Sequence, residues 1–203
     1  DLVRSRGLGD VYKRQVNNIA ISLLLVLFIF GISKAAVMPF HSWLPAAMVA
    51  PTPVSALLHA VAVVKVGVFS IIKVLVYIFG LDILLGLFTV DFMIYICGFT
   101  IITTSVIAIK QDNLKKLLAY STISQLSYVV IAILILTPSA IIAASMHLVA
   151  HAVSKITLFF AAGAIYSSTG YTKISEMDGI GKKLKVVSIA FTLGAMSLVG
   201  IPL

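Results

Sequence analysis

Long apolar runs are the feature of this sequence that most constrains its fold. Runs close to the ~20 residues needed to cross the ~30 Å hydrocarbon core of a bilayer follow one another along the chain. The composition agrees, because 61% of the 203 residues are hydrophobic, only 11% are charged, and the mean hydropathy is +1.14. We therefore predict an integral, multi-pass membrane protein whose fold is all-α, a polytopic transmembrane helix bundle.

The apolar runs predict five full spans and the start of a sixth. The full spans cover residues 17–50, 54–79, 91–110, 119–136 and 140–167, and the sixth begins near Val186. Two helix starts carry a signal of their own. At Thr52-Pro53 and at Thr137-Pro138, a hydroxyl able to cap the helix precedes a proline suited to the first turn.

The first fifteen residues differ from those that follow, because they hold all the arginines of the chain, Arg4, Arg6 and Arg14. We interpret residues 1–15 as a non-native leader and residues 16–203 as a partial transmembrane domain. A secretory signal is the alternative, since a basic stretch followed by an apolar run has that outline.

Lysines in the connectors predict the orientation of the bundle. The connectors after the third and fifth spans are rich in lysine, whereas those after the second and fourth contain none. By the positive-inside rule, both lysine-rich connectors face the cytoplasm, together with the junction at Pro51. We expect the membrane to be a prokaryotic plasma membrane. These loop lysines also explain the net charge of +8 without nucleic acid as a partner.

Basic side chains inside the apolar runs are the candidate functional residues. An ionisable group at membrane depth is costly unless it is paired or hydrated, so such groups mark ion or proton pathways. We expect no acidic residue inside the spans, and counter-charges would come from other segments or subunits. The candidates for proton translocation are Lys34, His59, Lys65, His147, His151 and Lys155.

The segment after Lys34 predicts a discontinuous helix, because Pro39 and Pro45 follow it closely. Each proline removes a backbone donor and frees a carbonyl, and at membrane depth such groups persist only where protein or water covers them. We therefore expect a hydrated cavity beside Lys34. The alternative is an interfacial segment anchored by Trp43, with Lys34 reaching the surface along its alkyl stem.

Lys65 lies about 16 Å along its helix from Val54, at 1.5 Å per residue. Its ammonium is too deep to reach either surface easily, so we predict that it exchanges protons. Lys73, near the outer end of the same span, is instead predicted to be an interfacial anchor.

His147, His151 and Lys155 follow one another at intervals of four residues, which places them on one helix face. Because imidazole both donates and accepts, this face predicts a hydrogen-bonded proton relay. A metal site, which would need further ligands, and a purely structural pair of packed histidines are the alternatives. We expect neither a metal nor a cofactor, and we interpret Cys97 as a packing residue.

Three strings in this order resemble a known family. They are KAAVMPFHSWLPAAMVAPTPVSALLHAVAVVKVGVF (34–69), DNLKKLLAYSTISQLSYVVIA (112–132) and HLVAHAVSKITLFFAAGAI (147–165). They resemble the antiporter-like membrane subunits shared by respiratory complex I (NADH:quinone oxidoreductase), its hydrogenase relatives and the Mrp-type cation/proton antiporters. The resemblance covers nearly everything after residue 16.

The resemblance implies an antiporter-like fold in which the six candidate residues form a proton path. It also implies function within a complex of other membrane subunits, moving protons or exchanging Na⁺ for H⁺. Ala46, where respiratory subunits commonly carry an acidic residue, favours the D-type subunit of an Mrp antiporter. The alternatives are a proton-pumping subunit of NADH:quinone oxidoreductase or of a membrane-bound hydrogenase and, in a different class, a passive membrane scaffold. We expect no catalytic site in this chain, so redox chemistry would belong to its partners.

Overall fold

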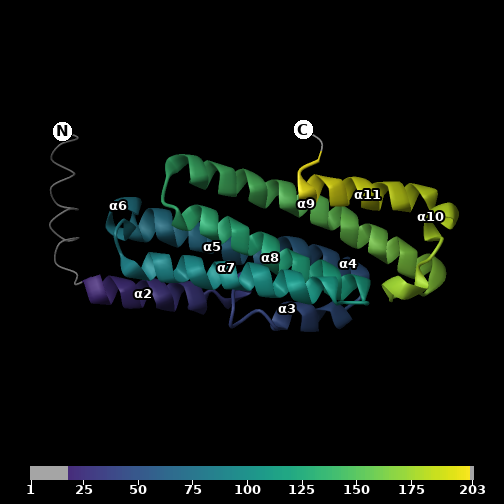
Figure 1. The fold of residues 1–203 in the computed structure, drawn as a ribbon, viewed down its shortest axis with the longest axis horizontal. Coiled ribbons are helices and arrows are strands. Elements are labelled where there is room, and N and C mark those ends of the chain that lie inside the picture. The colour runs from purple at the N-terminus through teal and green to yellow at the C-terminus, as the bar shows by residue number, and fades with distance from the viewer. Residues whose placement is uncertain (1–17, 202–203) are drawn as a thin grey trace.

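The computed structural model describes residues 18–201, apart from the side chains of residues 58–61. The predicted leader, residues 1–15, lies outside this range and stays a prediction. The regular elements of the described part are helices, without a β-strand, which confirms the all-α fold. The long helices run side by side along one axis of the molecule (Figure 1).

The helices are, in chain order, α2 (Asn18–Gly31), η1 (Ser33–Ala35), α3 (Trp43–Ala46), η2 (Ala47–Val49), α4 (Thr52–Val54), η3 (Ser55–Val63), α5 (Val64–Lys73), η4 (Val74–Phe79), α6 (Leu81–Leu84), α7 (Phe88–Ile109), α8 (Leu114–Leu134), α9 (Pro138–Thr169), η5 (Ile174–Glu176), α10 (Ile180–Lys183) and α11 (Lys185–Val199). Of these, α7, α8 and α9 are long and apolar enough to cross a membrane, and α2 and α11 are apolar but shorter.

The predicted second span is helical throughout residues 52–79, but its turns are not uniform. α-Helical turns alternate with the wider π-helical turns of η3 and η4. The sequence pattern did not predict these wide turns, which are frequent at functional sites of proteins.

One predicted helix start is confirmed and the other is wrong. Thr137 caps α9, because its hydroxyl accepts a hydrogen bond of 3.3 Å from the backbone N–H of Ala140. Thr52 instead occupies the first turn of α4, after Pro51, and makes no capping bond. Its methyl group lies so close to Gly163 on α9 that a Cβ at that glycine would approach it to 2.7 Å. Thr52 is therefore a packing residue.

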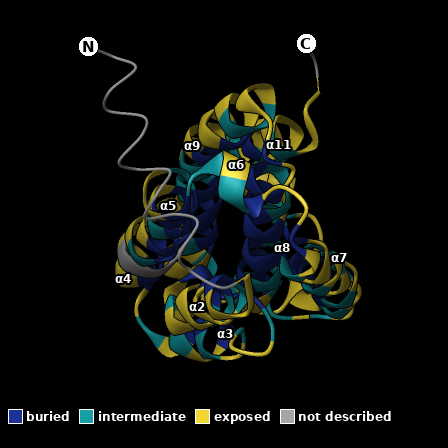
Figure 2. Ribbon diagram, turned by 90° about the vertical axis from the view of Figure 1, so that its left-hand side faces the viewer, coloured by how far each residue is buried: buried dark blue, intermediate teal, exposed yellow. Residues whose placement is uncertain are grey.

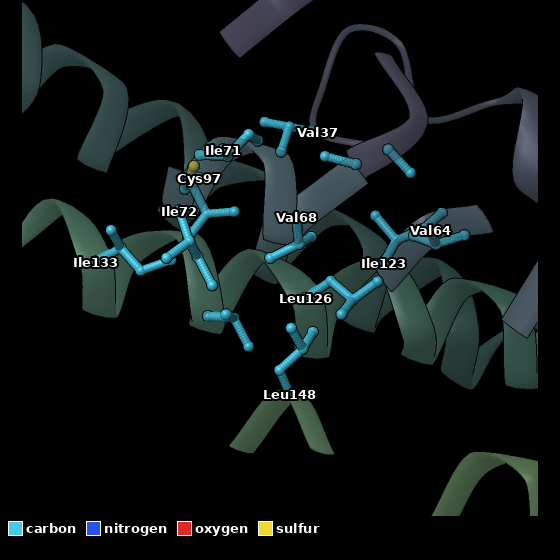
Figure 3. Close-up of a cluster of buried hydrophobic side chains, with 14 of the residues drawn as sticks. Val37, Val64, Val68, Ile71, Ile72, Cys97, Ile123, Leu126, Ile133 and Leu148 are labelled. Carbon is cyan, nitrogen blue, oxygen red and sulfur yellow. The ribbon is translucent and has the colours of Figure 1, made fainter. Parts of the chain in front are cut away.

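The buried residues gather in the centre of the bundle, and the exposed faces lie outside (Figure 2). Figure 3 shows part of this core, where Cys97 lies near Ile71 and Ile72. Cys97 is 1% exposed and forms no disulfide, which confirms the packing interpretation. Many large apolar side chains remain exposed, among them Tyr77 and Tyr95, as expected for surfaces that face lipid.

The two lysine-rich connectors meet at one end of the bundle. The backbone N–H of Leu114 donates to the carbonyl of Thr172 at 3.1 Å, and the N–H of Ile174 donates to the carbonyl of Asp112 at 2.7 Å. Lys115 donates to the carbonyl of Ala50 at 3.1 Å, which brings the Pro51 junction to the same end. The predicted common side is confirmed, and α6 lies at the opposite end (Figure 1). That this side is cytoplasmic stays a prediction.

Candidate functional site

Lys155 is completely buried, at 0% exposure, between α9 and α8. Its ammonium donates to the hydroxyl of Ser121 at 2.5 Å and to the backbone carbonyl of Leu118 at 3.2 Å. Both partners belong to α8, and neither carries a charge. The Leu118 carbonyl is a shared acceptor, because it also accepts from the hydroxyl of Ser121 at 3.1 Å and from the hydroxyl of Thr122 at 2.7 Å.

The two histidines before Lys155 lie next to each other, as their spacing predicted. Their rings stack, with centroids 6.1 Å apart and planes at 24°. His147 Nε2 lies 3.0 Å from Gln125 Oε1, and since that oxygen only accepts, the histidine nitrogen is the donor.

His151 is 1% exposed, and neither of its ring nitrogens has a hydrogen-bond partner among the side chains that the structure describes. The described residues therefore show no hydrogen bond that links His151 to His147 or Lys155, and the proton relay stays a prediction. Proton transfer at His151 requires a ring rotation or an intervening proton carrier.

Lys65 joins this cluster from a different helix. It lies on α5 and is 8% exposed, which confirms that its side chain is buried. Its charge acts on both His151 and Lys155, and Lys155 in turn acts on His151. Two helices thus bring three of the six candidate residues together. The side chain of His59, on η3, lies outside the described residues, and its role stays a prediction.

Lys34 lies at the predicted helix break, in η1, and is exposed in this chain. η1 rests directly on α5 at Gly67, where an added Cβ would come within 2.6 Å of the Ala35 nitrogen and 2.7 Å of the Lys34 carbonyl carbon. Gly67 is two residues from Lys65, so the break is held beside the helix that carries that lysine. The interfacial alternative for Lys34 and the predicted role in proton transfer both remain untested.

The backbone groups freed at the break bind protein groups. Trp43 Nε1 donates to the carbonyl of Ser33 at 3.1 Å, and the N–H of Met38 donates to the hydroxyl of Thr100 on α7 at 3.3 Å. Pro39 follows a cis peptide bond, whereas Pro45 is buried within α3. Protein therefore covers these described groups of the break, and the hydrated cavity expected there stays a prediction.

Sequence reasoning missed the residues on α8 that bind the basic face of α9. Ser121 and Gln125 contact Lys155 and His147 respectively. A signal was present, because two polar residues four apart in an apolar helix share one face, as do the residues they contact.

Two predictions concern acidic residues and potential metal ligands of the described part. The prediction that no acid lies within a span fails at one position, because α7 begins before Asp91 and includes it as an exposed residue of its first turn. Among residues 18–57 and 62–201, no group of three histidine, cysteine, aspartate or glutamate side chains could hold a metal ion.

A bundle of apolar helices with a broken helix and basic side chains buried between helices defines a polytopic membrane protein with an antiporter-like fold. The family model described as NADH:quinone oxidoreductase/Mrp antiporter, transmembrane, matches residues 5–203. The chain belongs to this family.

Two relatives with the same name illustrate the similarity. The chain is 37% identical over 203 residues to NAD(P)H-quinone oxidoreductase subunit 5, chloroplastic, of Vicia faba, covering 95% of this chain and 26% of that protein. The protein of the same name from Zygnema circumcarinatum is 32% identical over 212 residues, covering 100% of this chain and 29% of that one. The chain thus spans about a quarter of the length of the curated relatives it matches.

Solved structures give the same fold. A chain of the Mrp complex from Dietzia sp. DQ12-45-1b aligns with a TM-score of 0.83 at 27% identity, covering 91% of this chain and 34% of that chain. A chain of the membrane-bound sulfane sulfur reductase, an archaeal respiratory membrane complex, aligns with a TM-score of 0.78 at 27% identity, covering 92% and 38%. This chain is therefore part of an integral, multi-pass membrane subunit.

Proposed function

We propose that this chain forms part of the proton-translocating core of a membrane subunit in a multi-subunit complex. The observation that carries this proposal is the burial of Lys65, His151 and Lys155 in the interior of the bundle, on two different helices. Burying three basic groups together is unfavourable for stability, so their presence favours a role in moving charge.

The contacts of Lys155 suit a group that gains and loses a proton. The Ser121 hydroxyl accepts from the ammonium form while it donates to the Leu118 carbonyl at 3.1 Å, and by turning its proton it can donate to the neutral amine. A carboxylate partner would instead hold the lysine in its charged form. The site therefore stabilises both states of the same side chain.

Repulsion between buried charges couples the protonation of Lys65 to that of Lys155. In a medium of low dielectric, a proton on Lys65 disfavours a second proton on Lys155, because like charges repel strongly there. A proton that arrives at one lysine therefore promotes release from the other. His151, which both lysines influence, is the group through which a proton passes between them.

We also propose which kind of complex contains this subunit. The relatives named as subunit 5 of NAD(P)H-quinone oxidoreductase support a place in an ion-pumping oxidoreductase. The structural likeness to a chain of the Mrp complex supports a cation/proton antiporter, within which Ala46 favours the D-type subunit. Other membrane subunits and the coupling ion, H⁺ or Na⁺, are its partners in either case. The membrane is a prokaryotic plasma membrane or, as the names of the plant relatives suggest, a chloroplast membrane.

The test replaces Lys155 by methionine in the full-length parent, within its complex, and measures proton flux in proteoliposomes with a pH-sensitive dye. Methionine keeps the apolar stem and removes the ionisable amine. We expect flux to fall by about 100-fold or more, the scale of losing a positioned proton-transfer group. Lys65→Met should have the same effect.

Lys73→Met is the matched control. Lys73 is exposed and lies over the rings of Phe69 and Tyr77, with its Nζ 5.5 and 5.1 Å from their centroids, as an interfacial anchor would. This variant should insert, assemble and conduct normally. Undiminished flux in Lys155→Met and in Lys65→Met would rule out this proton path and favour a passive scaffold.

A further inference from the structure

A cavity of about 790 Å³ opens at the end of the bundle where the lysine-rich connectors meet. It lies between the segment around Pro51, the start of α8, the last turns of α9 and the connector that follows. These elements are at the right-hand end of Figure 1. Its volume falls within the ~300–1,000 Å³ of pockets that bind small molecules. None of the proton-path candidates whose side chains the structure describes lines it.

The lining of the cavity has two chemical parts. One is cationic, from Lys115 and Lys116, and none of the described residues that line the cavity is acidic. The other part is apolar and includes Met48, Val49 and Phe160. Val49 is 92% exposed, so the apolar part opens outward rather than into the core.

We propose that this cavity binds an anionic phospholipid, with the phosphate at Lys115 and Lys116 and an acyl chain along the apolar part. Basic pockets between membrane helices on the cytoplasmic side are suited to anionic headgroups, and the lysine-rich end is the predicted cytoplasmic end. Tyr166 and Tyr171 also line the cavity, and tyrosine is enriched at the level of the headgroups.

Lys115 is already positioned for such a ligand. It is half-buried, and its Nζ donates to the Ala50 carbonyl at 3.1 Å and lies 5.9 Å from the centroid of the Tyr166 ring. An ammonium has three donors, so it can bind a phosphate oxygen while keeping the carbonyl. A bound lipid would then join the segment before Pro51 to α8 and α9.

The experiment uses the full-length parent in detergent and counts lipid adducts by native mass spectrometry during titration with phosphatidylglycerol or phosphatidylcholine. We expect phosphatidylglycerol to bind more tightly. The double variant K115Q/K116Q should weaken its binding about 30-fold, taking ~1 kcal/mol for each lysine near an anionic surface. The matched control, K182Q/K183Q, removes two exposed lysines of α10 that do not line the cavity and should bind like the wild type.

A second variant distinguishes loss of the binding site from misfolding of the first variant. Ala164→Phe keeps both lysines but fills the cavity from α9, and it should also abolish the preference for phosphatidylglycerol. Excess inorganic phosphate should not displace the lipid, because the acyl chain contributes to binding.

Four results would each overturn the proposal. Equal binding of the two lipids would show that charge does not select the ligand. Equal losses in K115Q/K116Q and K182Q/K183Q would indicate general attraction to a basic surface. Full displacement by inorganic phosphate would identify a free anion as the ligand. Retained binding in both cavity variants would mean that the lipid binds elsewhere on the protein. None of these readouts measures flux, so they are independent of the proton-transfer proposal.

Discussion

Gly67 gives the most direct test of how the helix break is held against α5. In Gly67→Ala, the new methyl group would lie 2.6 Å from the nitrogen of Ala35 and 2.7 Å from the carbonyl carbon of Lys34. Both atoms are backbone, so no side-chain rotation relieves the overlap. To reach an ordinary contact, η1 must move away from α5 by roughly 0.8 Å.

The expected cost follows from two opposing effects. Overpacking of this kind costs about 1–3 kcal/mol, whereas alanine is favoured over glycine within a helix by about 0.5–1 kcal/mol. We therefore expect Gly67→Ala to lower the free energy of unfolding by up to roughly 2.5 kcal/mol. Because the displaced segment carries Lys34, flux should fall as well.

The matched variant is Gly98→Ala, on α7, where an added Cβ meets nothing within 4 Å. It should be as stable as the wild type or slightly more stable. The free energies would be measured on the full-length parent by reversible unfolding in mixed micelles with increasing SDS, followed by circular dichroism. Equal stability of Gly67→Ala and Gly98→Ala, with flux preserved in both, would refute the close packing of η1 on α5.

Two further predictions concern contacts between distant segments. Gly163→Ala should destabilise the same protein, because its methyl group would meet Thr52 Cγ2 at 2.7 Å, and adding Thr52→Ser should restore stability by removing that methyl. Hydrogen bonds from the backbone N–H and hydroxyl of Ser175 lower the pKa of Asp112 from its ordinary value of 3.8. The stabilising effect of the Asp112 carboxylate is therefore complete above that value and is lost as the pH falls through the lowered pKa. The protection of the amides of residues 171–176 against hydrogen exchange, relative to their intrinsic rates at each pH, should therefore fall over that acidic range in the wild type but not in Asp112→Asn.

The sequence predicted the long helices because their apolar length is a local property. α7 and α9 begin and end within three residues of the predicted spans. α8 begins at Leu114, five residues before the prediction, because Lys115 and Lys116 were interpreted as connector. The structure shows the reason for the difference. Asn113 caps the helix, and the lysines sit in its first turn at the end of the bundle, where long basic side chains reach the interface.

The sequence could not predict the contacts between distant segments. Asp112 and Ser175 are 63 residues apart, and nothing near either residue indicates their pairing. The partners of Lys155 required the register between α8 and α9, which helical periodicity does not determine. The same periodicity did predict correctly that His147 and His151 lie next to each other, because that relation lies within one helix.

Two lysines of this chain make similar hydrogen bonds but differ in burial, and the difference in burial suits them to different roles. Lys115 and Lys155 each donate to a backbone carbonyl, of Ala50 and of Leu118 respectively. Lys115 is half-buried beside an open cavity, so solvent and any anionic ligand can stabilise its charge, and it suits binding. Lys155 is fully buried, with only a hydroxyl and a carbonyl as described hydrogen-bond partners, so its charge is costly. Position in the bundle, rather than residue type or local sequence, thus separates the lysine that would hold a ligand from the lysine that would transfer a proton.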